Sequence, residues 1–185
     1  PELVRSSLIA AESRVNRFFR QNGVQGVLNE IDKLESEYVQ EHYAGLLVNL
    51  SGVSAMGYPT IVDRVSKAID DSDYYLSEFL RKGLDKFVGS KEAMEAVFRA
   101  SESMDSDHYK TEIIKEALRV QPVSVESVRV ILAATNKMES DHYKTEVLTT
   151  LLKQQNLGDA IISEMINSTK QFESDHYRTV VLNKA

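Results

Sequence analysis

Acidic and imidazole side chains recur together at three places in this chain. Each place has Asp followed by His, and in two of them a Glu follows four residues after the His. The members are Asp107, His108, Glu112, Asp141, His142, Glu146, Asp175 and His176. Carboxylates and imidazoles bind divalent metals and exchange protons near neutral pH. The residue types therefore suggest a metal site or a surface that responds to pH.

The spacing of the three copies argues against a metal centre. Ser-Asp-His-Tyr-Lys-Thr-Glu occupies 106–112 and again 140–146, and Ser-Asp-His-Tyr-Arg-Thr occupies 174–179, so the copies start 34 residues apart. A fixed period of this size is typical of stacked helical units. Equivalent residues of stacked helices stand about 10 Å apart, whereas zinc ligands each approach the metal to about 2.0–2.2 Å. We therefore interpret the histidines as solvated, with partner contact as the alternative, and expect no metal and no cofactor.

The residues between the copies predict two amphipathic helices per unit. Apolar residues recur in the first half of each unit at Met94/Val128/Ile162, Val97/Ile131/Met165 and Phe98/Leu132/Ile166, and in the second half at Ile113/Val147/Val181 and Ile114/Leu148/Leu182. Offsets of three and four residues place them on one stripe of a helix. Helices of about 12–15 residues are marginal alone, so each must pack on its neighbours. Short loops make the two helices of a unit antiparallel neighbours.

The residues at the predicted helix starts are good caps. Ser140 precedes the second helix of its unit, where its hydroxyl can accept a backbone N–H, and Asp141 complements the helix dipole. Ser90 and Ser124 stand in the same place before first helices. Pro59 fits a first helical position because its missing N–H would be unpaired there.

We expect an all-α fold, namely a right-handed, curved α-solenoid. It consists of one leading helix and five antiparallel helix pairs in a single domain. The leading helix lies within 1–22 (helical from 2 to 20), and the repeats cover 24–53, 54–88, 89–122, 123–156 and 157–185. One repeat should have its helices at 60–69 and 73–87. Neither terminal repeat shows the polar capping face that solenoids usually carry, so we expect a segment of a longer protein.

Composition narrows the function classes. The chain is 42% hydrophobic and 27% charged, which is typical of a globular protein. A net charge of −6 disfavours nucleic acid as a partner, and no run approaches 18 apolar residues, so no membrane insertion is expected. The absence of cysteine leaves the compartment open, periplasm and cytoplasm alike. Phosphate-loop, zinc-protease and serine-hydrolase motifs do not occur.

The repeats resemble a short bacterial form of HEAT-type repeat. The run Ser-Asp-His-Tyr-Lys-Thr-Glu-Val-Leu at 140–148 is similar to Ser-Asp-x-x-(Lys/Arg)-x-x-Val-Leu repeats in soluble regions of some bacterial envelope-associated proteins, among them regulatory ones with antirepressor-type metallopeptidase domains. The resemblance covers about 24–185 and implies a binding or spacer array. Tetratricopeptide repeats share the period but not the signature residues, so they rank second.

The motif residues have structural interpretations beside the functional ones. We expect the tyrosines at 109, 143 and 177 to be core aromatics. Lys110, Lys144 and Arg178 are expected to reach the aspartate of an adjacent unit, which would make a structural ladder with Asp107, Asp141 and Asp175; a ligand-facing site is the alternative. Arg5, Arg14, Arg17 and Arg20 fit a solvated face better than a contact with an acidic membrane.

The function most consistent with these observations is a non-catalytic scaffold. It would present an extended surface to another protein or to another domain of its parent chain. The surface expected to bind is that of the second helices, with His108, Glu112, His142, Glu146 and His176. The alternatives are a regulatory sensor of pH or metal, and an enzyme with a pocket across repeats.

Overall fold

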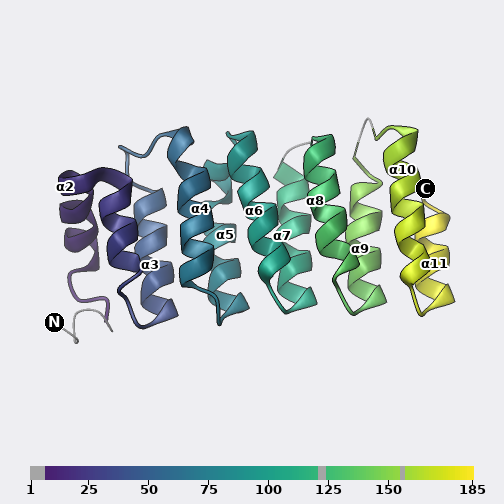
Figure 1. Ribbon diagram of the computed structural model, residues 1–185, viewed down its shortest axis with the longest axis horizontal. Helices are drawn as coiled ribbons and strands as arrows, with labels where there is room; N and C mark the ends of the chain where they lie inside the picture. Colours follow the sequence, from purple (N-terminus) through teal and green to yellow (C-terminus); the bar gives the residue numbers. More distant parts are fainter. Residues whose placement is uncertain (1–6, 121–123, 155–156) are drawn as a thin grey trace. The chain divides into compact units, whose positions relative to one another are not determined.

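The computed structural model describes residues 7–120, 124–154 and 157–185, and over these ranges the chain is all-α with no strand (Figure 1). Its α-helices are α2 (Ala11–Ile31), α3 (Glu37–Val48), α4 (Tyr58–Ala68), α5 (Asp73–Phe87), α6 (Lys91–Ser103), α7 (Asp107–Val120), α8 (Val125–Asn136), α9 (Asp141–Leu151), α10 (Asp159–Ser168) and α11 (Asp175–Leu182). Two 3₁₀ helices, η1 (Ala55–Gly57) and η2 (Thr169–Gln171), complete the list. In the described residues no helix has the length and apolar character needed to span a bilayer.

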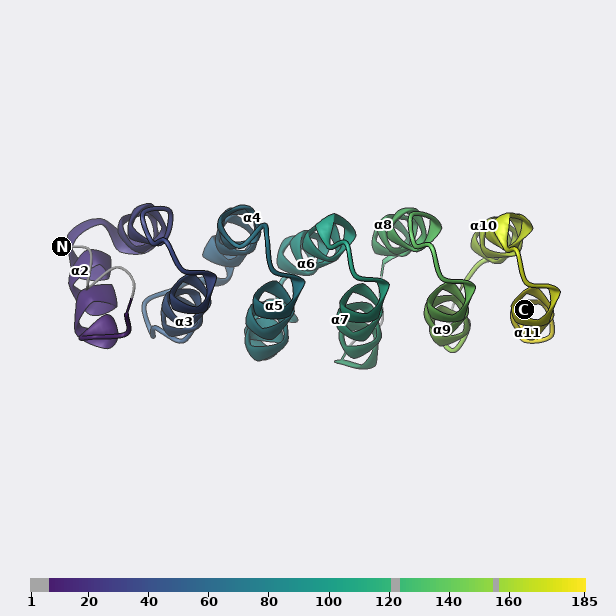
Figure 2. The ribbon, with the colours of Figure 1, turned by 90° about the horizontal axis from the view of Figure 1, so that it is seen from below.

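The chain divides into two compact units, residues 1–100 and 101–185, and the boundary falls within α6. In the first unit α3 packs against α2, α4 and α5, and α4 packs against α2 and α5. The later half of α2 lies in one row with α4, while α3 and α5 form a second row (Figure 2). The core of this unit contains Leu28, Leu47, Ile61 and Leu80, all fully buried.

The second unit has the same internal plan. Here α9 packs against α7, α8 and α11, and α8 packs against α10. Figure 2 shows α7, α9 and α11 in one row and α8 and α10 in the other. The buried side chains between them include Ile114, Ile131, Leu148 and Met165. Each helix therefore buries an apolar stripe that it could not cover alone.

The leading helix begins later than expected. Residues 7–10 are not helical, and Ala10 has a left-handed backbone (φ 54°) directly before α2 begins at Ala11. The predicted helical stretch before residue 7 lies outside the described residues. Helix α2 also contains a kink at Asn22 and Gly23, where Gly23 adopts φ 58°. The kink lets the two halves approach so closely that a Cβ on Gly26 would lie 2.5 Å from the Phe18 carbonyl oxygen.

Other helix bounds agree with the sequence. The helix predicted at 73–87 is α5, and the helix predicted at 60–69 is α4, which begins two residues earlier with Pro59 in its first turn. The hydroxyl of Ser90 accepts the Ala93 N–H at 3.2 Å, and that of Ser124 accepts the Ser127 N–H at 3.1 Å. Both serines therefore cap first helices as expected.

Candidate functional site

The repeated motif forms the start of the second helix in each helix pair of residues 101–185. Helices α7, α9 and α11 begin at Asp107, Asp141 and Asp175. The preceding Ser140 and Ser174 have extended backbones, as N-caps do, but neither hydroxyl makes a capping hydrogen bond. The expectation that Ser140 caps through its side chain is therefore wrong, because these serines contribute their backbone N–H groups instead.

The aspartates connect one turn to the next. The Oδ2 atom of Asp107 accepts the N–H groups of Glu139 and Ser140, both at 2.8 Å. One motif later, Asp141 Oδ2 accepts the N–H of Ser174 at 2.8 Å. Hydrogen bonds to an ionised acceptor are stronger than neutral ones. Each carboxylate thus fixes the turn of the following helix pair.

The same connection occurs within residues 1–100. There Glu37 occupies the aspartate position, and its Oε1 accepts the Asp71 N–H at 3.0 Å. The Glu side chain is one methylene longer, and its bond joins residues 34 apart, compared with 32 and 33 for the bonds of Asp107 and Asp141. A carboxylate at the start of the second helix is therefore the constant requirement, and its identity as Asp is secondary.

The motif lysines pair within their own motif. Lys110 and Lys144 are only 4% and 8% exposed, and their Nζ atoms lie 4.0 Å and 3.3 Å from Oδ1 of Asp107 and Asp141. The expected pairing with the aspartate of an adjacent unit is wrong, since residues three apart share one helix face and meet directly. Each aspartate therefore serves both its own lysine and the next turn. Lys144 Nζ also lies 5.6 Å from the centre of the Phe172 ring. Arg178, at the equivalent position of α11, is exposed.

The motif tyrosines are not core residues. Tyr109, Tyr143 and Tyr177 are only partly buried. The buried side of α9 is formed by Lys144, Thr145, Val147, Leu148 and Leu151. Tyr143 falls at the edge of that arc, so the prediction that it is a core aromatic is wrong.

The tyrosine rings alternate with the histidine rings instead. Within each motif the two rings lie 5.1–5.3 Å apart, as in His142–Tyr143 at 5.1 Å. Across motifs the His108 ring lies 6.0 Å from that of Tyr143, and the His142 ring lies 5.8 Å from that of Tyr177. These separations and the tilted geometry are those of favourable aromatic pairs. The three histidines are exposed, as the sequence predicts.

Two tyrosines in residues 1–100 take the histidine position. Tyr38 and Tyr74 follow the helix-starting residues Glu37 and Asp73, and both are about half exposed. The Tyr38 ring lies 6.0 Å from that of Tyr75, the same cross-motif contact that His108 makes. These two residues were not predicted from the sequence. Their place two positions after Ser36 and Ser72, as each motif histidine stands two positions after its serine, is the signal that identifies them.

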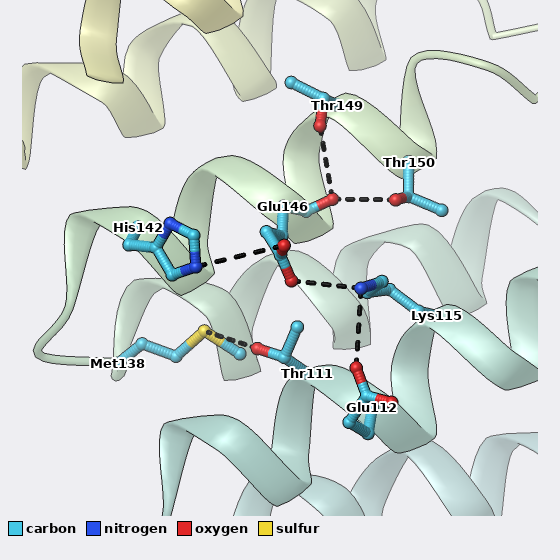
Figure 3. Close-up of polar contacts among 8 residues, drawn as sticks. All are labelled: Thr111, Glu112, Lys115, Met138, His142, Glu146, Thr149 and Thr150. Carbon is cyan, nitrogen blue, oxygen red and sulfur yellow. Dashed lines mark hydrogen bonds and ion pairs between the residues drawn. The ribbon is translucent and has the colours of Figure 1, made fainter. Parts of the chain in front are cut away.

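Charged side chains lie beside His142 (Figure 3). Lys115 lies between the two glutamates, with Nζ 3.0 Å from Glu146 Oε2 and 3.4 Å from Glu112 Oε1. The hydrogen bond that the Lys115 ammonium donates to Glu146 raises the pKa of Lys115, although partial burial acts in the opposite direction. His142 Nε2 lies 3.9 Å from the other Glu146 oxygen. The structure thus brings together His142, Glu146 and Glu112 through a lysine that the sequence analysis did not name.

An open depression lies next to this network on α7 and α9. It is lined by Lys115, Leu118, Arg119, Glu146, Thr149, Thr150, Lys153 and Gln154. The hydroxyls of Thr149 and Thr150 donate to the Glu146 carbonyl oxygen, and Gln154 donates to the Leu118 carbonyl oxygen at 3.0 Å. The lining is mainly polar and basic, so it can accept acidic groups of a partner.

The arginines of the leading helix differ from one another. Arg14 is largely buried, forms an ion pair with the buried Glu30 and lies 5.7 Å from the centre of the Tyr43 ring. The expected solvated face is therefore wrong for Arg14. Arg17 and Arg20 are exposed, and Arg5 lies outside the described residues.

Over residues 7–120, 124–154 and 157–185 no group of three or more His, Cys, Asp or Glu is placed to hold a metal ion.

Comparisons of the chain with protein-family models, with curated proteins and with solved structures find no match. The similarity to HEAT-type repeats therefore depends on the repeated residues alone. The candidate site is defined by its own geometry, a row of exposed rings whose spacing is set by buried Asp–Lys pairs and carboxylate-to-turn hydrogen bonds.

Proposed function

We propose that this chain is a non-catalytic repeat scaffold that binds another protein, or another domain of its parent chain, through its second helices. The observation that carries the proposal is the recurrence of one exposed ring at each motif, namely His108, His142 and His176 in residues 101–185. Tyr38 and Tyr74 take the same position in residues 1–100.

Exposed rings held by stacking are suited to binding. Aromatic side chains supply a large contact area at small entropic cost and are enriched among residues that dominate binding energy. Here the His108 and His142 rings are positioned before any partner arrives, because each of these two packs on the tyrosine of the next motif. Preorganisation of this kind lowers the cost of association.

The repetition itself favours binding over catalysis. A reaction needs one asymmetric pocket with distinct acid, base or nucleophile positions. Three copies of one motif supply the same group at regular intervals, which matches an extended partner. The Glu112–Lys115–Glu146 network adds charged groups beside the rings and can set the orientation of that partner.

For the fold, we propose a right-handed α-solenoid of antiparallel helix pairs, similar to HEAT repeats. The 34-residue period supports it, as do the contacts of α9 with α7 and α11 inside the second unit. Tetratricopeptide-type packing is the second choice.

The test is partner capture from an extract of the source cells by immobilised protein. The variant His108→Ala/His142→Ala/His176→Ala removes three rings. Its matched control, Asn136→Ala/Ser163→Ala/Asn167→Ala, changes three exposed residues of α8 and α10. We expect the first triple variant to lose a captured protein that wild type and control both retain, with all three proteins folded by circular dichroism. Equal capture by all three would remove this surface from consideration.

A pH-responsive surface is the second candidate. The favouring observation is the distance of 3.9 Å between His142 Nε2 and Glu146 Oε1, since a protonated imidazole would form an ion pair there. Binding of the captured protein should then depend on pH more strongly in wild type than in His142→Gln. Identical pH profiles for the two proteins would eliminate the sensor role.

A further inference from the structure

The outer side of α11 carries exposed residues whose equivalents in α9, one motif earlier, are buried. In α9 the side chains of Lys144, Thr145, Leu148 and Leu151 are buried. The residues 34 positions later, Arg178, Thr179, Leu182 and Ala185, are all exposed, and Leu182 is 41% exposed. Helix α11 covers the corresponding side of α9, whereas no described helix covers that side of α11.

Apolar residues of α10 are likewise more exposed than their equivalents in α8. Val128 and Leu132 of α8 are each no more than 5% exposed. Their equivalents Ile162 and Ile166 are only partly buried. Apolar side chains are thus available on both helices of this last pair, at the positions by which the preceding pair contacts its neighbour.

The polar and aromatic groups by which α9 contacts the following motif also have exposed equivalents on α11. Asp141 binds the backbone N–H of the following turn, and Asp175 stands exposed at the same motif position. The His142 ring contacts the tyrosine of the following motif, and the exposed His176 ring is the equivalent group. A carboxylate acceptor, an imidazole ring and an apolar strip therefore occur together in the arrangement that α9 uses to hold α11.

We infer that this end face, formed by Ile162, Ile166, Asp175, His176 and Leu182, is a docking surface for a further helix pair of the same type. The occupant is defined by its chemistry. Its inter-helix turn offers a backbone N–H to Asp175, the helix after that turn carries a tyrosine for His176, and its apolar stripe covers Leu182. The end face shares only His176 with the exposed ring row, and the inference does not depend on what that row binds.

The experiment adds such a helix pair to the full chain. A copy of residues 152–185 joined after Ala185 continues the 34-residue period, so its turn serine falls where Asp175 can bind it. Hydrogen exchange of α11 amides is measured in the original and the extended chain. We expect α11 to exchange at least about tenfold more slowly in the extended chain, which corresponds to about 1.4 kcal/mol of added protection.

Two variants test whether the bond between Asp175 and the added turn causes the slower exchange. Asp175→Ala should remove most of the added protection in the extended chain and have little effect in the original chain. Replacing the serine of the added copy that corresponds to Ser174 by proline removes the donated N–H and should have the same effect. Asp159→Ala, an exposed acidic residue in the first turn of α10, is the matched control and should leave the added protection unchanged.

Three results would overturn the inference. The first is unchanged α11 exchange on adding the helix pair. The second is an Asp175→Ala effect of the same size in both chains. The third is self-association of the original chain in sedimentation with α11 protected in the dimer, because the occupant would then be the same face of a second copy.

Discussion

Replacing Asp141 by alanine tests the connection between motifs most stringently. Its carboxylate accepts the Ser174 N–H at 2.8 Å and lies 3.3 Å from Lys144 Nζ, and the two side chains are 9% and 10% exposed. The substitution therefore removes an acceptor from a turn and leaves an ammonium nearly buried. Breaking a buried ion pair by removing one partner costs about 3–5 kcal/mol, and hydrogen bonds to charged groups contribute about 1.5–3 kcal/mol each.

These contributions overlap, because one carboxylate makes both contacts. Lys144 also retains the Phe172 ring as a neighbour, 5.6 Å away. We therefore expect Asp141→Ala to lower the free energy of unfolding by about 3 kcal/mol. The double variant Asp141→Ala/Lys144→Met should regain at least about 1 kcal/mol, since it no longer buries an unpaired charge.

Asp175→Ala is the matched control. Asp175 also begins a helix after a serine, so both substitutions lose a favourable helix-dipole contribution of about 0.3–1 kcal/mol. Of these two aspartates, only Asp141 accepts a hydrogen bond from a following turn in the described part of the chain. The assay is urea denaturation at equal protein concentration, with the denaturant slope checked for constancy. A difference below about 1 kcal/mol between the two alanine variants would refute the reasoning.

Three further results are expected. Tyr43→Ala should cost about 3–5 kcal/mol because Tyr43 is fully buried, whereas Tyr143→Ala should cost about 1 kcal/mol because its ring is partly exposed; equal losses in urea denaturation would contradict this. Burial raises the pKa of the Tyr43 phenol, so its contribution to stability is fully present below about pH 10 and is lost as pH rises through the raised pKa. Denaturation between about pH 8 and pH 11 should therefore show a steeper loss for wild type than for Tyr43→Phe, and parallel curves would contradict the assignment. Calorimetric titration of chelator-treated protein with zinc should show no site tighter than about micromolar, because the Tyr143 ring lies between His108 and His142; a stoichiometric submicromolar site would overturn that reasoning.

The helices were predictable because the signal repeats. A fixed period of 34 residues aligns each capping residue and each apolar stripe with its equivalents, and this gives α5 its bounds at Asp73 and Phe87. The kink in α2 was not predictable in the same way. It depends on the left-handed backbone at Gly23 and the close approach at Gly26, and within residues 7–120, 124–154 and 157–185 Gly23 is the only glycine with a positive φ.

The burial of the motif residues was predicted less well. Tyrosine is usually the more buried residue type and lysine the more exposed, but in this motif the order is reversed. Lys144 is buried because Asp141 neutralises it one turn away, and that pairing depends on the rotation of α9 relative to its neighbours. A shift of one residue in helical register rotates a side chain by about 100°, which apolar periodicity alone does not resolve at the edge of a stripe. The ring row was missed for the same reason.

Amide hydrogen exchange at Ser174 reports directly on the bond between successive motifs. The motif aspartate connects the second helix of one pair to the turn of the next pair, and through this connection it sets the spacing of the exposed rings. The Ser174 N–H, bonded to Asp141 Oδ2 at 2.8 Å, should exchange slowly in wild type and at least about tenfold faster in Asp141→Ala, with no change in Asp175→Ala. An equal exchange rate at Ser174 in wild type and Asp141→Ala would contradict the claim.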